Sequence, residues 1–486
     1  MTAALVTGFL TAGCSSDAEP SADKRQPSTQ AQTPDAPLDV IDAGSTAPAA
    51  NELSRRLFAS SPVAVLASAA DADAQRLAIG AATELGVPAL VDHADAAAEL
   101  DRLGTTTVLT FGPTREVAGA RAVPLDEAAI GAEIERSSAS ADEAAPRSTK
   151  AIVLTRSERA DAVATATARI AGAQVLELPD ADPRTSPEAA QYLAAHPTDP
   201  VIAIGSEFAQ VGYPLDVVRN DVQQPSGGYL ALGKHYTAMY GHPGAPQLGV
   251  LGEQGVRASI ERVGRLVRKY RRAAPDSEFV PTFEVIATVA SASAGKDKDY
   301  STETSVKKLL PIVDAAGQAG VYVILDLQPG RTDFLTQAKK YRSLLERPHV
   351  GLALDPEWRL KAKQKHLVQI GSVTAAEINR TGDWLAELTR SKGLPQKIFV
   401  LHQFSSSMIK HRNRLDTSHP ELATVIHVDG SGPQGAKQET WRHLRDNAPR
   451  GIGWGWKNFV DEDSPMLTAE QTWRRVKPHP DLVTYQ

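Results

Sequence analysis

The feature that most constrains the fold is a regular alternation of short apolar runs and helical segments over residues 233–486. The spacing of apolar residues predicts helices between most of these runs. Seven or eight such β/α units in roughly 250 residues match the size and rhythm of a (β/α)8 (TIM) barrel, which is the fold we expect. An open doubly wound sheet is the alternative. The strand-like runs are 235–240, 283–289, 321–328, 350–355, 397–403, 422–429, 451–457 and 482–485.

Residues 51–225 alternate between strands and helices in the same way, in two successive sets. Such alternation predicts parallel sheets with right-handed crossovers. The segment has no Gly-x-Gly-x-x-Gly turn and no phosphate loop, so dinucleotide binding is unsupported. We therefore expect an α/β protein with N-terminal parallel α/β repeats at 51–225 and a TIM-barrel domain at 226–486. The expected strands of the repeats are 63–68, 87–91, 107–112, 151–155, 173–178 and 200–205.

The first of these sets has a recognisable order of motifs. Asp71 and Asp73 lead into an Ala-rich helix, Gly86-Val-Pro-Ala-Leu90 follows, and the next strand ends in Gly112. This order resembles the cell-wall-binding repeats of Gram-positive surface proteins. The resemblance implies that the first half binds a polymer of the cell envelope, and a scaffold or spacer is the alternative.

Polar and charged residues gather where the strands of the second half end. The ends of barrel strands converge on one face, where the active sites of TIM-barrel enzymes are built, so we expect these residues to form one site. The candidate catalytic groups are the carboxylates of Asp326, Asp355, Glu357 and Asp429. The candidate substrate-binding residues are Tyr240, His242, Glu284, Gln328, Trp358, His402, Gln403, Trp454, Trp456 and Lys457.

The sharpest local motif is Asp355-Pro356-Glu357-Trp358. Residues two apart in a strand face the same side, so the two carboxylates are expected to share a pocket and repel each other. The repulsion raises one pKa, as a general acid requires near neutral pH. The motif resembles the Asp-x-Glu of chitinase-type glycosidases and of barrel-type muramidases. This resemblance implies that Glu357 donates the proton and that Asp355 is its electrostatic partner.

The same resemblance implies a second carboxylate, Asp326 or Asp429, that activates water or stabilises an oxocarbenium-like transition state. Trp358, Trp454 and Trp456 fit a sugar substrate because indole faces pack against the apolar faces of pyranose rings. The alternative for Trp454 and Trp456, which alternate with glycines, is that they fill the barrel mouth.

The N-terminus has the outline of an export signal, with an apolar run that ends in Leu10-Thr-Ala-Gly-Cys14. This segment resembles the lipobox of bacterial lipoproteins, which implies a signal peptide at 1–14, lipid attachment at Cys14 and a position outside the cytoplasm. Residues 15–50 are rich in Ser, Pro, Asp and Ala and predict a flexible tether. Cys14 is the single cysteine of the chain, which excludes an internal disulfide and a cysteine-based zinc site.

The charge balance argues against nucleic acid as a partner, because 52 basic residues face 58 acidic ones and the net charge is -6. No cofactor motif and no zinc spacing is present, so neither cofactor nor metal is expected. The second half contains short motifs such as Leu325-Asp-Leu-Gln328 and Leu401-His-Gln-Phe404. With these motifs it resembles bacterial, actinobacterial-type envelope lipoproteins of unassigned function.

Three functions remain open from the sequence. The leading expectation is a lipid-anchored glycoside hydrolase that acts on cell-envelope polysaccharide. The first alternative is a lipoprotein that binds this polysaccharide without cleaving it. The second is a metal-dependent phosphodiesterase, because the acids and His242 form an oxygen-rich set of possible ligands for Mg2+ or Ca2+.

Overall fold

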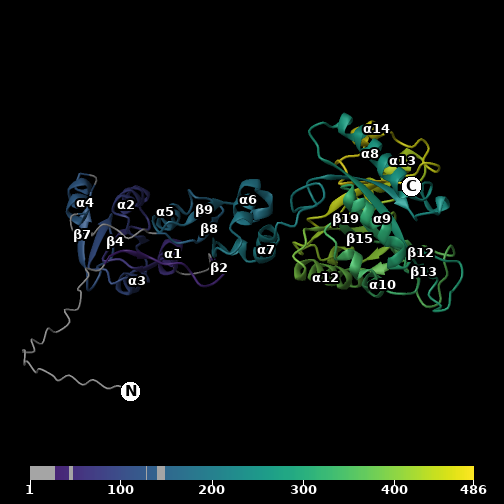
Figure 1. The fold of residues 1–486 in the computed structure, drawn as a ribbon. Coiled ribbons are helices and arrows are strands. Elements are labelled where there is room, and N and C mark those ends of the chain that lie inside the picture. Colours follow the sequence, from purple (N-terminus) through teal and green to yellow (C-terminus); the bar gives the residue numbers. More distant parts are fainter. Residues whose placement is uncertain (1–27, 43–47, 127, 139–147) are drawn as a thin grey trace, which may run out of the picture. The chain divides into compact units, whose positions relative to one another are not determined.

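The computed structural model describes residues 28–42, 48–126, 128–138 and 148–486 (Figure 1). The chain divides into two compact units. The first unit contains the described parts of Met1–Pro34, Thr46–Ala151 and Asp161–Gln174. The second contains the described parts of Asp35–Ser45, together with Ile152–Ala160 and Val175–Gln486. Cys14 and the expected signal peptide lie outside the described residues.

The first unit is a parallel four-stranded sheet with helices. Its elements are β1 (Gln30–Ala31), α1 (Ala49–Leu57), β3 (Phe58–Ser60), β4 (Val63–Ala67), α2 (Ala72–Leu85), β5 (Ala89–Val91), α3 (Ala96–Arg102), β6 (Thr107–Phe111), β7 (Arg121–Leu125), α4 (Ile130–Ser138) and α5 (Ala162–Ile170). The strand order is β5-β4-β6-β7, and β1 pairs with β3 in a separate antiparallel pair. Asp71 caps the N-terminus of α2, and its side chain accepts hydrogen bonds from the backbone N–H groups of Asp73 and Ala74. The expected parallel α/β pattern is confirmed here.

The second unit begins with a sheet assembled from segments that lie far apart in the sequence. Its elements are β2 (Leu38–Ile41), β8 (Ile152–Thr155), β9 (Gln174–Glu177), α6 (Pro187–Ala195), β10 (Val201–Ile204) and α7 (Gly212–Asn220). The strand order is β2-β10-β8-β9, and β10 pairs in parallel with both β2 and β8. Residues 38–41, which we expected within the flexible tether, form β2 because Leu38 and Val40 pack against an apolar cluster of this sheet. Residues 175–225 belong to the same compact unit as the barrel, so the expected boundary at 225 does not separate the two units.

The remainder of the second unit is a closed barrel of eight parallel strands. They are β11 (His235–Gly241), β12 (Phe279–Ala290), β14 (Tyr322–Leu327), β15 (Val350–Leu354), β17 (Lys397–His402), β19 (Leu422–Val428), β20 (Gly453–Asn458) and β21 (Leu482–Tyr485). Each strand pairs with the next, and β11 pairs in parallel with both β12 and β21, which closes the barrel. The expected TIM-like fold is confirmed.

Helices and short strands connect the barrel strands. They are α8 (Val256–Ala273), β13 (Ser301–Glu303), α9 (Val306–Gln318), α10 (Phe334–Lys340), α11 (Arg342–Leu345), β16 (Val373–Thr374), α12 (Ala375–Ser391), β18 (Ile409–Lys410), α13 (Gln434–Arg445) and α14 (Ala469–Arg475). The connection from β17 to β19, described throughout, contains no α-helix. There β18 pairs with β16, which lies just before α12. This connection replaces one outer helix of the regular barrel.

The barrel has two apolar layers, one inside the strands and one between the strands and the helices. Alternate residues of each strand point inward. The inner layer includes Tyr322, Ile324, Ile398, Val400 and Val425, all buried. One or two inward positions further along each of these strands, the side chains become polar. The barrel interior is therefore apolar in its lower part and carries ionisable groups toward the carboxyl ends of the strands.

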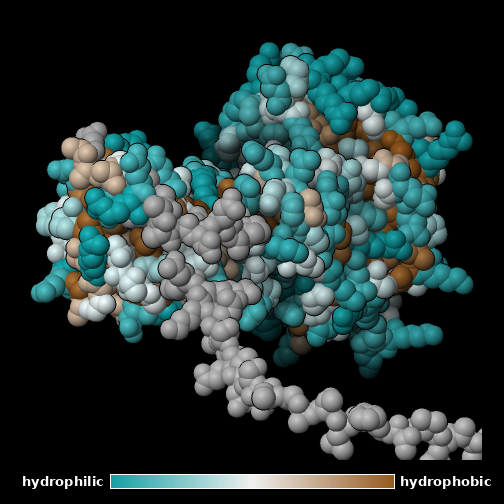
Figure 2. Space-filling view, turned by 60° about the vertical axis from the view of Figure 1, so that its left-hand side comes forward, coloured by the Kyte–Doolittle hydropathy of each residue, from teal (hydrophilic) through white to brown (hydrophobic). Residues whose placement is uncertain are grey.

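The surface in the space-filling view is mostly hydrophilic, and apolar residues gather in separate patches (Figure 2). Among the residues that the structure describes, no helix has the length and hydropathy required of a membrane span.

Candidate functional site

A cavity of about 590 Å³ opens at the carboxyl ends of the barrel strands. This is the end at which TIM-barrel enzymes bind their substrates. The lining combines acidic, aromatic and aliphatic side chains with one lysine. Its residues are Tyr240, Gln247, Leu248, Ile286, Val289, Ala290, Gln328, Asp355, Glu357, Trp358, Phe404, Asp429, Gly430, Ser431, Thr440, Lys457, Phe459 and Gln486.

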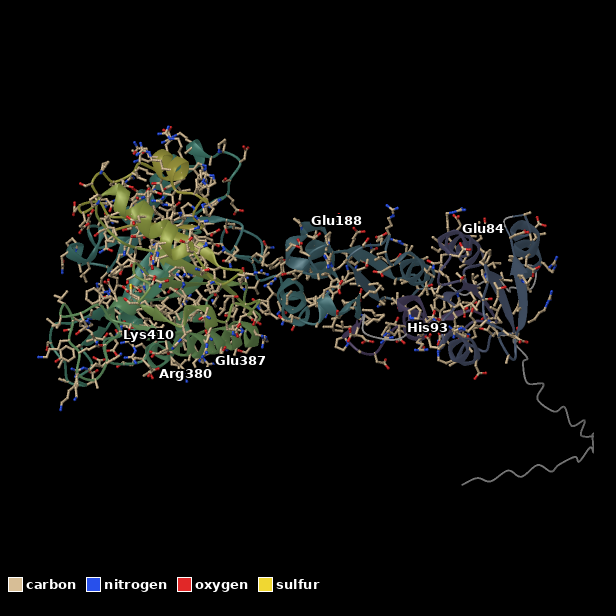
Figure 3. All side chains as sticks on the ribbon, turned by 180° about the vertical axis from the view of Figure 1, so that it is seen from behind. Glu84, His93, Glu188, Arg380, Glu387 and Lys410 are labelled. Atoms are coloured by element: carbon tan, nitrogen blue, oxygen red, sulfur yellow. The ribbon has the colours of Figure 1, made fainter. Side chains whose placement is uncertain are left out.

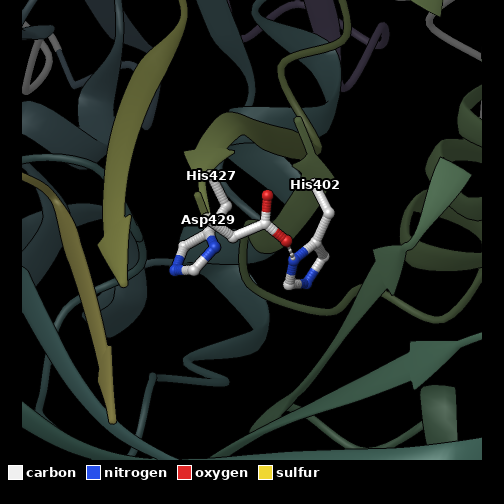
Figure 4. A group of neighbouring side chains, drawn as sticks. All are labelled: His402, His427 and Asp429. Carbon is white, nitrogen blue, oxygen red and sulfur yellow. Dashed lines mark hydrogen bonds and ion pairs between the residues drawn. The ribbon is translucent and has the colours of Figure 1, made fainter. Parts of the chain in front are cut away.

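A buried histidine joins two carboxylates at the base of this cavity. His402, at the end of β17, donates from Nδ1 to Asp429 Oδ2 at 2.8 Å (Figure 4). Its other nitrogen, Nε2, donates to Glu284 Oε1 at 2.8 Å and lies 4.0 Å from Asp326 Oδ1. Burial acts against the charged ring, but the carboxylates of Glu284 and Asp429 outweigh it and raise the pKa of His402 well above its ordinary value. His402 is therefore an imidazolium that donates from both nitrogens.

A second chain of hydrogen bonds connects the neighbouring strands. The Tyr240 hydroxyl donates to Asp326 Oδ2 at 2.9 Å, and Gln328 Nε2 donates to the Tyr240 oxygen at 3.2 Å. Gln328 Oε1 in turn accepts from the backbone N–H of Ala290 at 2.9 Å. Lys457 Nζ lies 3.8 Å from the centroid of the Tyr240 ring, within the range of a cation–π interaction. These contacts hold Tyr240 and Asp326 in fixed orientations beside the cavity.

Burial and mutual repulsion raise the pKa of three of the acids. Burial raises the pKa of Glu357 to about 7, and the negative charge of Asp429 adds to this rise. Burial also raises the pKa of Asp326 to about 6. The pKa of Asp355 rises well above its usual range because the group is buried and because Glu357 is near. Neutral and charged carboxyl groups therefore coexist in one site near neutral pH, which is the condition for general acid and base chemistry.

Four buried carboxylate oxygens of this site have no hydrogen-bond partner among the described residues. They are Glu284 Oε2, Asp326 Oδ1, Asp355 Oδ1 and Asp429 Oδ1. An unpartnered buried acceptor is costly, and such groups in a folded protein call for a physical explanation. Asp355 and Asp429 line the cavity, so a ligand that carries hydroxyl or N–H donors is able to satisfy their free oxygens.

A second buried histidine, His427, lies beside His402 with 4.8 Å between the ring centroids (Figure 4). Its Nε2 forms a hydrogen bond of 3.0 Å with the Thr484 hydroxyl. Burial and the positive charge of His402 lower the pKa of His427 well below its ordinary value, so this ring is neutral. The site thus contains one charged and one neutral imidazole in contact.

Within this site, two groups of side chains place metal-ligating atoms within 4.8 Å of one another. One is Glu284, Asp326 and His402, and the other is His402, His427 and Asp429. Both include His402, and a histidine that binds a metal needs a deprotonated nitrogen. Both nitrogens of His402 donate to carboxylates. The same atoms therefore form an ion-pair network around a protonated His402, and they lie close enough together to hold a metal ion when His402 is deprotonated.

The structure brings most of the sequence-predicted residues together. The Asp355-Pro-Glu357 motif follows the fourth barrel strand, and both of its carboxyl groups line the cavity, as expected. The cause differs from the expected strand alternation, because β15 ends at Leu354 and residues 356–358 form a 3-10 turn. The predicted residues that line the cavity are Tyr240, Gln328, Asp355, Glu357, Trp358, Asp429 and Lys457, whereas Glu284, Asp326 and His402 lie buried beneath them.

Four predicted residues lie elsewhere. Trp454 and Trp456 face outward and pack against Trp441 of α13, with ring centroids 6.0 and 5.7 Å apart, because the inward positions of β20 belong to glycines and Lys457. The expectation that these two tryptophans line the site is therefore wrong. His242 bonds to the Thr304 hydroxyl, and Gln403 bonds to Ser405 and Arg412. Neither of these residues lines the cavity.

Sequence reasoning missed His427 and the cavity walls formed by Ile286, Phe404 and Phe459. A signal for His427 was present, because it lies two residues before Asp429 and faces the same side of a strand. The wall residues carry no comparable signal. They become neighbours only when the barrel closes.

Comparison with protein-family models, with curated proteins and with solved structures gives no match for this chain.

Proposed function

We propose that the barrel is a glycoside hydrolase that acts on cell-envelope polysaccharide. The observation that carries the proposal is a pair of cavity-lining carboxyl groups in unlike environments. Burial and the charge of Asp429 raise the pKa of Glu357 to about 7, so this carboxyl group is still partly protonated at neutral pH. Asp429 accepts a hydrogen bond from the His402 imidazolium and keeps Oδ1 without a partner.

In this proposal Glu357 protonates the oxygen of the glycosidic bond as the bond breaks. Asp429 uses its free oxygen to accept a proton from the attacking water or to stabilise the oxocarbenium-like transition state. Asp355 is the electrostatic partner of Glu357, whose nearness adds to the burial that raises the pKa of Asp355. Asp326 holds the Tyr240 hydroxyl in place. Trp358 lines the cavity and offers an indole face for a pyranose ring.

The proposed place of action rests on the N-terminal sequence. Attachment of lipid at Cys14 would hold the protein on the outer face of the cell membrane, next to the envelope polymers. The first unit would then bind the polymer that the barrel cleaves.

The test measures reducing ends released from fragmented Gram-positive envelope polysaccharides. The enzyme is the full chain with Cys14→Ser, which prevents lipid attachment. We expect Glu357→Gln to lower the release at least 100-fold, since general acid catalysis typically contributes 10²- to 10⁴-fold. The matched control is Glu387→Gln on α12 (Figure 3), which removes a carboxylate whose side chain is 69% exposed.

Three outcomes separate the candidate functions. Release that a chelator does not affect and that Glu357→Gln abolishes supports the glycoside hydrolase. Metal-dependent formation of phosphomonoesters without new reducing ends would favour the phosphodiesterase. Binding with no release by the parent chain across several polymers would leave a polysaccharide-binding lipoprotein as the better account.

A further inference from the structure

The loop between Trp358 and β16 exposes an unusual amount of apolar side chain. Four large hydrophobic residues are strongly exposed among the described residues, and three of them lie in this loop. Leu367 is 88% exposed, Val368 is 76% exposed and Ile370 is 51% exposed. Single exposed apolar residues are ordinary, but a cluster at the surface marks an interaction site.

The loop is held in place at both ends and in its middle. The backbone N–H of Leu360 donates to the Gly330 carbonyl, and that of Gly371 donates to the Glu357 carbonyl, each at 2.7 Å. His366 bonds to the Tyr300 carbonyl at 2.9 Å and packs edge-on to Trp358 at 5.2 Å. The apolar side chains are therefore presented outward by an ordered loop.

The backbone at the tip is itself unusual. Leu367 has a φ of 62°, a left-handed conformation that is rare for a bulky residue and costs free energy. Strained conformations of this kind persist where the surrounding structure enforces them, and they concentrate at functional positions. The strained backbone at Leu367 therefore holds an apolar side chain that is 88% exposed to water.

Basic residues surround the apolar tip. Lys361, Lys363 and Lys365 belong to the loop and are exposed, and Lys410 (Figure 3) is exposed on β18. Lys410 contacts Lys361, and the contact and repulsion between the two ammonium groups lower the pKa of Lys410. No ion pair of these four lysines occurs within the part of the chain that the structure describes. Residues 361–370 contain three lysines and no acidic residue, although the net charge of the protein is -6.

We propose that the 361–370 loop docks on an anionic phospholipid bilayer, with Leu367, Val368 and Ile370 inserted among the lipids and the lysines against the headgroup phosphates. Apolar side chains beside lysines are the composition of segments that lie in the membrane interface. Each lysine near an anionic surface adds attraction. The three exposed apolar residues lie within four positions of one loop and next to lysines, a combination that fits an anionic bilayer.

The docked loop has a consequence for the cavity. Glu357 and Trp358 line the cavity and are joined to the loop by the chain and by the Gly371 hydrogen bond. Docking would therefore hold the cavity close to the membrane surface. The inference does not depend on the proposed hydrolase activity, and it is independent of lipid attached at Cys14.

The test is sedimentation of the full chain carrying Cys14→Ser with vesicles of phosphatidylglycerol and phosphatidylcholine. We expect binding that falls with added salt and is weak on pure phosphatidylcholine. The variant Leu367→Ser, Val368→Ser, Ile370→Ser should bind about tenfold more weakly, because the inserted side chains are lost. Reversal of Lys361, Lys363 and Lys365 to Glu should have a similar effect.

The matched control reverses Arg268, Lys269 and Arg272 of α8 to Glu, which changes the net charge equally. These residues lie at the carboxyl end of α8, and in a β/α unit that end is opposite to the cavity. The control should keep vesicle binding within about twofold of the parent. The proposal is wrong if the parent chain does not bind the vesicles, if the control weakens binding as much as the loop variants, or if only a soluble anionic polymer is bound.

Discussion

Replacing Glu357 by glutamine should stabilise the barrel in alkaline solution, because folding works against ionisation of this carboxyl group. Burial and the charge of Asp429 raise the pKa of Glu357 from 4.5 to about 7 in the folded protein. The unfolded chain releases this proton more easily than the folded chain does. The stabilisation that the neutral group gives is complete below pH 4.5 and is lost as the pH rises through 7.

The magnitude follows from the two pKa values. A rise from 4.5 to about 7 costs the folded state about 3 kcal/mol once the group is fully ionised. At pH 5 most of this cost is absent, and at pH 9 nearly all of it is present. Glutamine keeps the shape of the neutral acid and cannot ionise. We therefore expect the Glu357→Gln variant to gain about 2 to 3 kcal/mol over the parent between pH 5 and pH 9.

The measurement is equilibrium unfolding in urea at both pH values, followed by tryptophan fluorescence. All six tryptophans lie between residues 358 and 473, so this signal reports the barrel and not the first unit. Glu387→Gln, which removes an exposed carboxylate, is the matched control and should give equal stability differences at pH 5 and pH 9. A Glu357→Gln variant whose stability relative to the parent does not change with pH would refute the reasoning.

Two further predictions concern the buried histidines. Replacing His402 by asparagine leaves the carboxylates of Glu284 and Asp429 buried without their imidazolium, so we expect a loss of about 3 to 5 kcal/mol in the same unfolding assay. The added change Glu284→Gln should recover part of the loss, and no recovery would contradict the ion-pair interpretation. Replacing Gly455 by alanine places a Cβ 3.0 Å from His427 Cγ and 3.1 Å from its Cα, a clash expected to cost about 1 to 3 kcal/mol. Unchanged stability would show that the His427 ring is free to move.

The barrel was predictable from the sequence because each strand is a compact apolar run followed by a polar residue. The runs at 321–328 and 397–403 contain β14 and β17 in full, and their last residues include Asp326 and His402. The site followed from the same regularity, since parallel strands of a barrel end on one face. The sequence alone therefore predicted that these acids lie in one site.

The wrong assignments have two causes. One is the alternation of side chains between the two faces of a strand, and the other is the pairing of strands that lie far apart in the sequence. Trp456 and Lys457 are neighbours in a strand and cannot both face inward. The prediction included both residues. Gly455 faces His427 inside the barrel, so Gly453, Gly455 and Lys457 share the inward face and Trp454 and Trp456 the outward face. The strand β2 was assigned to the tether because a run of four residues gives little periodic signal, and its partner β10 lies far along the chain.

The pairing of β2 with β10 also sets an order of events during synthesis. β2 spans Leu38–Ile41 and leaves the ribosome long before β10, which spans Val201–Ile204. The chain of the first unit is made almost entirely between them. A nascent chain must therefore keep the β2 segment accessible until its partner arrives, and a chain that started at residue 50 would leave the β10 edge open to pairing with other molecules.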